Sequence, residues 1–247
     1  MRVLVPMAGD DTTPEGEQVN IYGNHVGSWN FAATAYLNRW KVKIYYEHYF
    51  DDHSQMFFQY GRWKDGHIGL EITFPKNRFI DTFVYEGLGT KDQTGPMLYD
   101  SFWGEFEEQI SAKDNYYNHY LYQGWQHWGM GIGNPLLPGP IYNKNGQITF
   151  ISNRVLAHHI GFCGSPCQSL SYRMLLSYSR HWGTYDNPLN EIKKQFNSLF
   201  EVTYAPQQLK GWSFTVSGAM DRGNLLGNNY GGMLVIRKQG IIKSGNK

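Results

Sequence analysis

The sequence predicts an all-β protein whose antiparallel strands run up and down in chain order. Three observations lead to this prediction: many segments in which apolar and polar residues alternate, tight connections between neighbouring segments, and no long apolar run. A period of two is typical of a strand, because successive side chains leave a pleated ribbon on opposite sides. A membrane-spanning helix needs ~20 consecutive apolar residues. No run approaches that length, so the sequence excludes a helical membrane protein.

The clearest alternation lies in residues 27–50, which we interpret as a β-hairpin. Only Asn38, Arg39 and Trp40 are left to turn the chain between its two halves, a length that suits a hairpin connection. One face of the hairpin is apolar, and the opposite face is polar and charged. The positions on the apolar face are Trp29, Phe31, Ala33, Ala35, Leu37, Val42, Ile44, Tyr46, His48 and Phe50.

Further alternating segments extend this pattern along the chain. We expect strands at about 67–74, 79–88, 153–163, 169–181, 200–204, 212–221 and 234–238, and a looser one at 2–8. A turn is expected at Gly164-Ser165-Pro166. Cys163 and Cys167 flank it, and they are either incidental residues or, in an oxidising compartment, a local disulfide.

The composition fits a barrel in which only alternate strand residues are apolar. Hydrophobic residues make up 41% of the 247 residues and aromatic residues 16%, with 28 glycines, while the mean hydropathy is −0.51. Transmembrane β-barrels give just such a weak hydropathy signal in each segment. The net charge of +1 and the lack of a basic cluster argue against nucleic acid as a partner.

The connections between the expected strands alternate in length. Short ones fall at 38–40, 75–78, 164–168 and 206–211, and long ones at 51–66, 89–151, 183–197 and 222–232. In a meander, this places every short turn at one end of the sheet, as in outer-membrane barrels. Aromatic residues flank the apolar stripes at both ends, as membrane-interface girdles do: Trp40, Phe74, Tyr172 and Trp212 beside short turns, and Phe50, Tyr178 and Trp182 near long ones.

We therefore predict an antiparallel up-and-down transmembrane β-barrel of the outer-membrane type, with a soluble β-sandwich as the alternative. Residues 1–247 are expected to form a single barrel domain with a long loop region at about 89–151. The run after Met1 is far too short for a signal peptide. We expect the chain to be the C-terminal part of a longer one, and its barrel to be incomplete because N-terminal strands are missing.

The long loop region holds the candidate binding site. Aromatic side chains gather there beside amides, and sugars suit such platforms because they present C–H faces and hydroxyls. The candidate glycan-binding residues are Tyr116, Tyr117, Trp125, His127 and Trp128, with Asn115, Tyr120, Tyr122, Gln123, Gln126 and Asn134 nearby. The alternative is that these aromatic residues pack inside the barrel or brace the loop. Lys91, Lys113, Asp114 and Arg222 could meet an acidic polymer near the mouth.

Other chemistry finds little support. Asp51, Asp52 and His53 could bind a cation or form an acid/base pair, but nothing places a nucleophile near them. His158 and His159 leave a strand on opposite faces and cannot easily chelate one metal. The sequence predicts no enzymatic activity, no cofactor and no metal, and a surface hydrolase would need Asp, His and Ser or a metal to converge at the rim.

Five runs resemble the outer-membrane capsule-assembly proteins called Wzi: residues 23–28 (GNHVGS), 46–52 (YEHYFDD), 90–96 (TKDQTGP), 114–119 (DNYYNH) and 124–131 (GWQHWGMG). The likeness extends over about 23–237, although the N-terminal half of such a barrel is missing. It implies a Gram-negative outer-membrane barrel that helps attach capsular polysaccharide to the cell surface. The implied partners are that polysaccharide, outer-membrane lipid and other capsule export or assembly proteins. No individual glycan-contacting residue is transferred, and a porin or small-solute channel is the alternative function.

Overall fold

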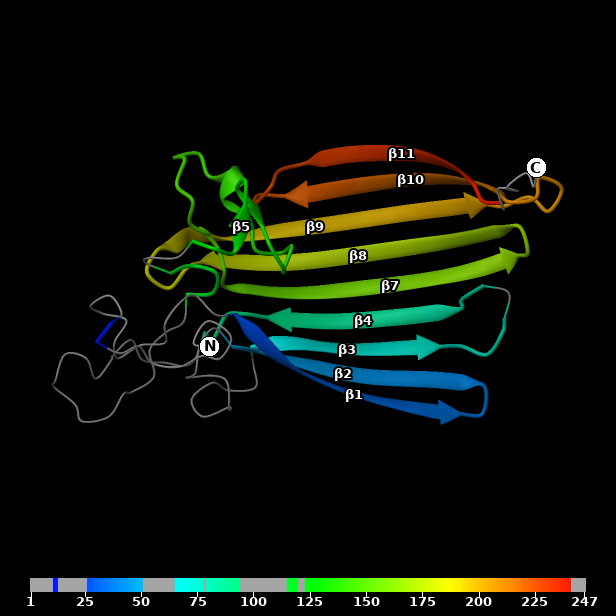
Figure 1. Ribbon diagram of the computed structural model, residues 1–247, viewed down its shortest axis with the longest axis horizontal. Helices are drawn as coiled ribbons and strands as arrows, with labels where there is room; N and C mark the ends of the chain where they lie inside the picture. The colour runs from blue at the N-terminus through cyan, green and yellow to red at the C-terminus, as the bar shows by residue number, and fades with distance from the viewer. Residues whose placement is uncertain are drawn as a thin grey trace, which may run out of the picture.

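The computed structural model describes residues 11–12, 26–50, 65–77, 79–93, 115–119 and 123–240. Their main feature is one nine-stranded antiparallel sheet in the order β1-β2-β3-β4-β7-β8-β9-β10-β11 (Figure 1). The strands are β1 (Gly27–Leu37), β2 (Trp40–Phe50), β3 (Gly66–Thr73), β4 (Thr82–Gly89), β7 (Val155–Cys167), β8 (Leu170–Gly183), β9 (Pro188–Tyr204), β10 (Trp212–Gly223) and β11 (Asn229–Lys238). The all-β class and the up-and-down order are confirmed. Within the described residues the sheet is open, with β1 and β11 as its edges.

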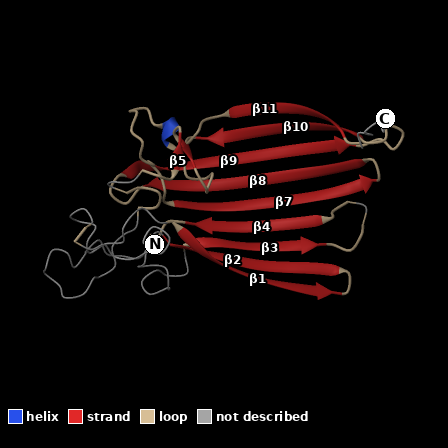
Figure 2. Cartoon of the chain, viewed as in Figure 1, coloured by secondary structure: helices blue, strands red, loops and turns tan. Residues whose placement is uncertain are grey.

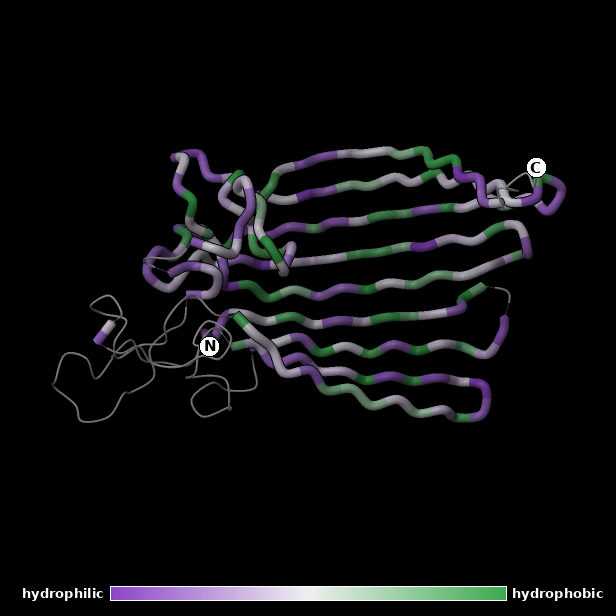
Figure 3. The backbone as a smooth tube through the Cα atoms, viewed as in Figure 1, coloured by the Kyte–Doolittle hydropathy of each residue, from purple (hydrophilic) through white to green (hydrophobic). Residues whose placement is uncertain are grey.

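The sheet has one apolar and one polar face, because residues paired directly across antiparallel strands point to the same side. Figure 3 shows the alternation along the strands. One row of the apolar face comprises Ala35, Val42, Ile72, Phe83, Phe162, Met174 and Phe200. One row of the polar face comprises Tyr45, Gly69, Glu86, His159, Ser177, Asn197, Asp221 and Asn229.

Exposure is inverted relative to an antiparallel sheet in water, which buries its apolar face. On the apolar face Phe31 is 54% exposed, Ile44 55% and Phe200 51%. On the polar face Ser179 and Gln195 are buried. A β-sandwich would need a second sheet against the apolar face, and the remaining sheet in the described part of the chain is the two-stranded β5 (Gln126–His127) and β6 (Met130–Gly131).

The predicted turn at Gly164-Ser165-Pro166 is wrong. These residues lie inside β7, where the pairing register with β8 shifts between Gly164 and Cys167. Proline cannot donate to a ladder and is tolerated at such irregularities. The chain instead turns at residues 168–169. Cys163 and Cys167 are free cysteines, so the structure contains no local disulfide between them.

Two of the predicted long loops are also wrong. β9 begins at Pro188, β10 ends at Gly223 and β11 begins at Asn229, so the connections shrink to 184–187 and 224–228. Lys193 and Lys194 pair with His181 and Arg180 of β8, because a neighbouring ladder supplies the backbone hydrogen bonds even to residues of low β-propensity. Long connections at this end remain between β2 and β3 and between β4 and β7.

Helix is almost absent from the described residues. The short 3₁₀ helix η2 (Pro140–Tyr142) lies beside β5 in the connection between β4 and β7 (Figure 2). No helix in the described ranges has both the length and the apolar character required to cross a membrane. The predicted strand at 2–8 and the group Asp51, Asp52 and His53 lie outside the described residues.

Candidate functional site

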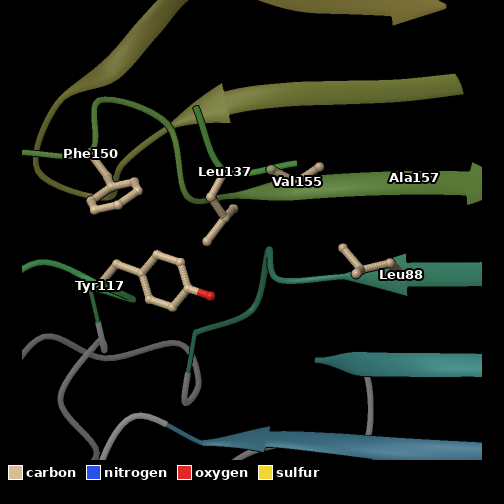
Figure 4. Packing of buried hydrophobic residues seen from close by; sticks show 6 residues of the cluster. All are labelled: Leu88, Tyr117, Leu137, Phe150, Val155 and Ala157. Atoms are coloured by element: carbon tan, nitrogen blue, oxygen red, sulfur yellow. The ribbon is translucent and has the colours of Figure 1, made fainter. Parts of the chain in front are cut away.

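The described part of the connection between β4 and β7 packs onto the polar face near the end of the sheet where β4 ends and β7 begins. We call residues 115–119 and 123–153 of this connection the covering segment. Figure 4 shows the packing of the buried cluster that joins the segment to the sheet. The segment contributes Tyr117, Leu137 and Phe150, and the sheet contributes Leu88, Val155 and Ala157. Burial of these six side chains holds the segment in place through the hydrophobic effect.

Tyr117 is the centre of this cluster. Its ring stacks on Trp125 with 5.6 Å between centroids, and it meets the edge of Phe150 at 5.1 Å. Its hydroxyl accepts a 2.8 Å hydrogen bond from the backbone N–H of Asn134. The backbone of Tyr117 is left-handed, with φ of 71°, a conformation that is uncommon outside glycine. The surrounding contacts hold it there, so Tyr117 has a structural role.

Tyr116 is buried and anchors the segment to the start of β3. Its hydroxyl donates to the Asp65 carboxylate at 3.0 Å, and the same carboxylate accepts the backbone N–H groups of Asp92 (2.8 Å) and Gln93. Burial raises the pKa of Asp65 above its ordinary value, although these three hydrogen bonds act to lower it. Asp65 therefore joins three separate stretches of chain through a carboxyl group held away from water.

Buried amides extend this polar anchor. The Asn153 side chain donates to the carbonyl of Tyr116 at 2.8 Å and to the Asn115 side chain, and it accepts from the Gln93 side chain at 2.9 Å. Asn118 exchanges two 2.8 Å hydrogen bonds with the backbone of Phe150. A buried network of this kind favours a single arrangement of the segments that it joins, although the side-chain oxygen of Gln93 has no hydrogen-bond partner within the described residues.

The hairpin formed by β5 and β6 presents an exposed aromatic tip. Trp128 and Gly129 form its two-residue turn with φ of 53° and 79°, the positive values of a type I′ turn. Trp128 is 85% exposed, and the exposed His127 ring lies 6.3 Å from it. A bulky residue in the left-handed region is a strained outlier, and such outliers often mark functional sites.

The five predicted site residues therefore separate into three groups. Tyr116 and Tyr117 are buried in the packing and hydrogen bonding described above, which agrees with the packing alternative for these two. Trp125 is half-buried against Tyr117, and His127 and Trp128 are exposed at the hairpin tip. Glycan binding by any of the five stays a prediction. Tyr120, Tyr122, Lys113 and Asp114 lie outside the described residues.

A cavity of about 970 Å³ lies between the covering segment and the polar face. The covering segment lines it with aromatic and apolar side chains, including Tyr117, Trp125 and Leu136. The polar face lines it with charged and amide side chains: Glu47, His67, Glu86, His159, Gln195 and Asn197. Apolar walls with a few converging polar groups are typical of small-molecule sites, whose volumes reach ~1,000 Å³.

The polar wall of the cavity is rich in hydrogen-bonding groups. The two ring nitrogens of His67 lie 3.8 Å from a Glu47 oxygen and 3.5 Å from a Glu86 oxygen. The Ser28 hydroxyl donates to Glu47 at 2.7 Å, and His159 bonds the Ser177 hydroxyl at 2.7 Å. Such a wall can both donate to and accept from ligand hydroxyls. The site prediction missed His67 and His159, although both lie on the polar parity of their strands.

Within the described part of the chain, no group of three or more His, Cys, Asp or Glu residues could hold a metal ion. Comparisons of the chain with protein-family models, with curated proteins and with solved structures found no match.

Proposed function

We propose that this chain is a non-enzymatic outer-membrane β-barrel protein that binds or anchors capsular polysaccharide at the surface of a Gram-negative cell. The observation that carries the proposal is the inverted sheet, whose apolar side chains are exposed while the polar face is covered at one end by the covering segment. Soluble monomers rarely expose apolar patches of more than a few hundred Å². In a bilayer the same face would contact hydrocarbon, which removes the cost of its exposure to water.

The dimensions of the apolar face support the membrane part of the proposal. Trp29 and Leu37 lie at opposite ends of β1, about 27 Å apart at ~3.4 Å per residue. With a strand tilt of ~40° this spans roughly 21 Å of membrane depth, near the ~25 Å apolar band of known barrels. Aromatic pairs lie at both ends, Trp29 with Phe50 at 6.1 Å and Trp40 with Phe74 at 5.0 Å.

The open edges of the sheet add a requirement. Unpaired backbone groups cost several kcal/mol each in hydrocarbon, so a β-sheet is stable there only when it closes into a barrel. Within the described residues β1 and β11 each pair on one side only. The proposal therefore includes further strands that pair with both edges and close the barrel.

The hairpin tip and the cavity support the polysaccharide part. Both lie at the end of the sheet that carries the two long connections, the end that faces outward in outer-membrane barrels. The exposed Trp128 offers a flat ring to a sugar, and the cavity wall offers hydrogen bonds to its hydroxyls. Residues 124–131, one of the runs that resemble Wzi, form this hairpin.

Binding of capsular oligosaccharides by the refolded full-length protein tests the proposal. We expect Trp128→Ala and Trp125→Ala each to weaken binding about tenfold, which corresponds to ~1.4 kcal/mol of lost ring contact. The matched control is Phe79→Ala, which removes an aromatic ring that is 67% exposed in the connection between β3 and β4, at the other end of the sheet. Unchanged affinity in both tryptophan variants would refute the aromatic platform. Steady conductance in planar bilayers would favour the channel alternative.

A further inference from the structure

A cluster of positive side chains lies on the apolar face near the end of β8, at the end of the sheet that carries the two long connections. Arg180 of β8 is directly opposite Lys194 of β9. Arg222 of β10 pairs with Phe196, which places it diagonally across from Lys194 on the same face. All three side chains are exposed. We call these three residues the cationic rim.

The arrangement of the cationic rim costs free energy in the protein alone. Like charges directly opposite each other on neighbouring strands repel. No ion pair involves any of the three among the described residues, and the nearby acidic groups bond elsewhere, Asp186 to Asn115 and Glu191 to Lys193. An anion bound between the three side chains would turn the repulsion into attraction.

Neighbouring aromatic rings contact Arg180 of the rim and two further cations, Lys91 and Arg154. The Trp182 ring has the Arg180 guanidinium 5.2 Å from its centroid and the Lys91 ammonium 4.8 Å from it. Arg154 lies 4.3 Å from the Tyr185 ring. Contacts of this kind stabilise a cation without neutralising it, so the positive potential at this end of the sheet persists.

The apolar face continues directly from the rim toward the middle of the sheet. Tyr178 and Leu176 precede Arg180 on the same face of β8, and Phe196 and Phe200 follow Lys194 on β9. Arg180 lies ten residues after Leu170, roughly 34 Å along the strand and about 26 Å in depth at ~40° tilt. The rim therefore lies where a ~25 Å hydrocarbon layer that begins near Leu170 would end.

We propose that the cationic rim binds the phosphate groups of an anionic lipid of the outer leaflet, with the acyl chains of that lipid lying along the apolar face. This inference rests on the proposed function, which places the long-connection end at the outer surface. Charge complementarity and the adjoining apolar strip together select an amphipathic occupant. Arginine presents a planar fork that matches phosphate oxygens, and such charge-assisted hydrogen bonds are among the strong ones.

The test measures binding of lipid A to the full-length protein in non-ionic maltoside micelles, read by tryptophan fluorescence. The probes are bisphosphorylated lipid A, the same lipid without its phosphates, and inorganic phosphate. The test variant is Arg180→Gln with Lys194→Gln and Arg222→Gln. The control variant, Lys76→Gln with Lys210→Gln and Arg237→Gln, removes three exposed positive charges near the short connections at the opposite end.

We expect the test variant to bind bisphosphorylated lipid A at least tenfold more weakly than wild type, with the control variant unchanged. Wild type should prefer the phosphorylated lipid at least tenfold, and Arg180→Lys with Lys194→Arg, which conserves the charge, should retain affinity within about threefold. Equal binding of both lipids, or wild-type binding by the test variant, would overturn the inference. So would displacement of the lipid by millimolar phosphate or by a capsular oligosaccharide, since either would make the rim a site for soluble anions.

Insertion into phosphatidylcholine vesicles, measured by protease protection, is scored separately. A protein that binds lipid A in micelles through the rim but fails to insert would contradict the proposed membrane location and leave the rim chemistry standing. A protein that inserts but binds lipid A equally well with and without its phosphates would contradict the rim inference and leave the proposed membrane location standing.

Discussion

The two faces of the sheet follow opposite solvent rules, and neighbouring residues of β9 make the contrast plain. Phe200 is 51% exposed on the apolar face. Glu201, the next residue, is on the polar face, where it accepts from Arg173 at 3.2 Å and from the Ser217 hydroxyl at 3.1 Å. In water the phenyl group would be buried and the carboxylate exposed. The contrast is what the proposed membrane location requires, with the apolar face against hydrocarbon and the polar face toward an aqueous interior.

Removing the ring at the centre of the buried cluster should have the largest effect, because it detaches the cover from the polar face. Tyr117→Ala is expected to cost the covering segment about 3–5 kcal/mol, as deletions of large buried rings do. Tyr117→Phe keeps the ring and loses only the bond from Asn134, for about 0.5–1.5 kcal/mol. Hydrogen exchange should rise in the covering segment (115–119 and 123–153) and at Ser179, while circular dichroism should show that the sheet is retained. Unchanged protection in Tyr117→Ala would show that the polar anchor alone holds the segment.

Placing an arginine on each face in turn compares the free-energy cost of a charge on the apolar face with its cost on the polar face. Phe200→Arg puts a cation near the middle of the apolar face, where a lipid-facing charge costs about 2–4 kcal/mol. The matched variant Leu199→Arg puts it on the polar face, where we expect less than about 1 kcal/mol. The measurement is unfolding from phosphatidylcholine bilayers by guanidinium. If the two variants are equally stable, the apolar face does not meet lipid.

The pH dependence of the polar anchor gives a smaller effect. Burial raises the pKa of Asp65 in the folded protein, so the folded state binds this proton more tightly than the unfolded state does. The free energy of unfolding should therefore fall as pH rises from the ordinary carboxyl pKa through the raised folded pKa, and the contribution is fully present below that window. Asp65→Asn, which cannot ionise, should lose this slope in denaturant titrations across the window. An identical slope in the variant would assign the pH dependence to another group.

The smallest expected effect on stability separates strain from function at the hairpin tip. Trp128→Asn places a residue that tolerates positive φ at the first turn position, so we expect unchanged or improved stability, by up to about 1 kcal/mol, together with weaker glycan binding. Thermal unfolding and oligosaccharide titration of the same variant check both parts. A loss of stability would mean that the indole ring braces the hairpin.

The strands were predictable because one face of each requires apolar residues at every second position, and the hairpin of β1 and β2 shows this best. The starts of β9 and β11 and the last residues of β10 were not predictable in this way. Lys193, Asn197 and Gly223 have low β-propensity and are held in β9 and β10 by pairing with neighbouring strands. In the candidate site, the composition identified an aromatic cluster. It could not separate the buried Tyr117 from the exposed Trp128, since burial depends on long-range packing against residues such as Leu88 and Val155.

The directions of the two edge strands constrain how a barrel could be completed. Because the antiparallel sheet has nine strands, β1 and β11 both run from the long-connection end toward the short turns (Figure 1). Direct joining of these edges would give a parallel seam, and so would side-by-side association of two copies inserted in the same orientation. An all-antiparallel ring requires an odd number of additional strands, the outermost of which run opposite to both β1 and β11.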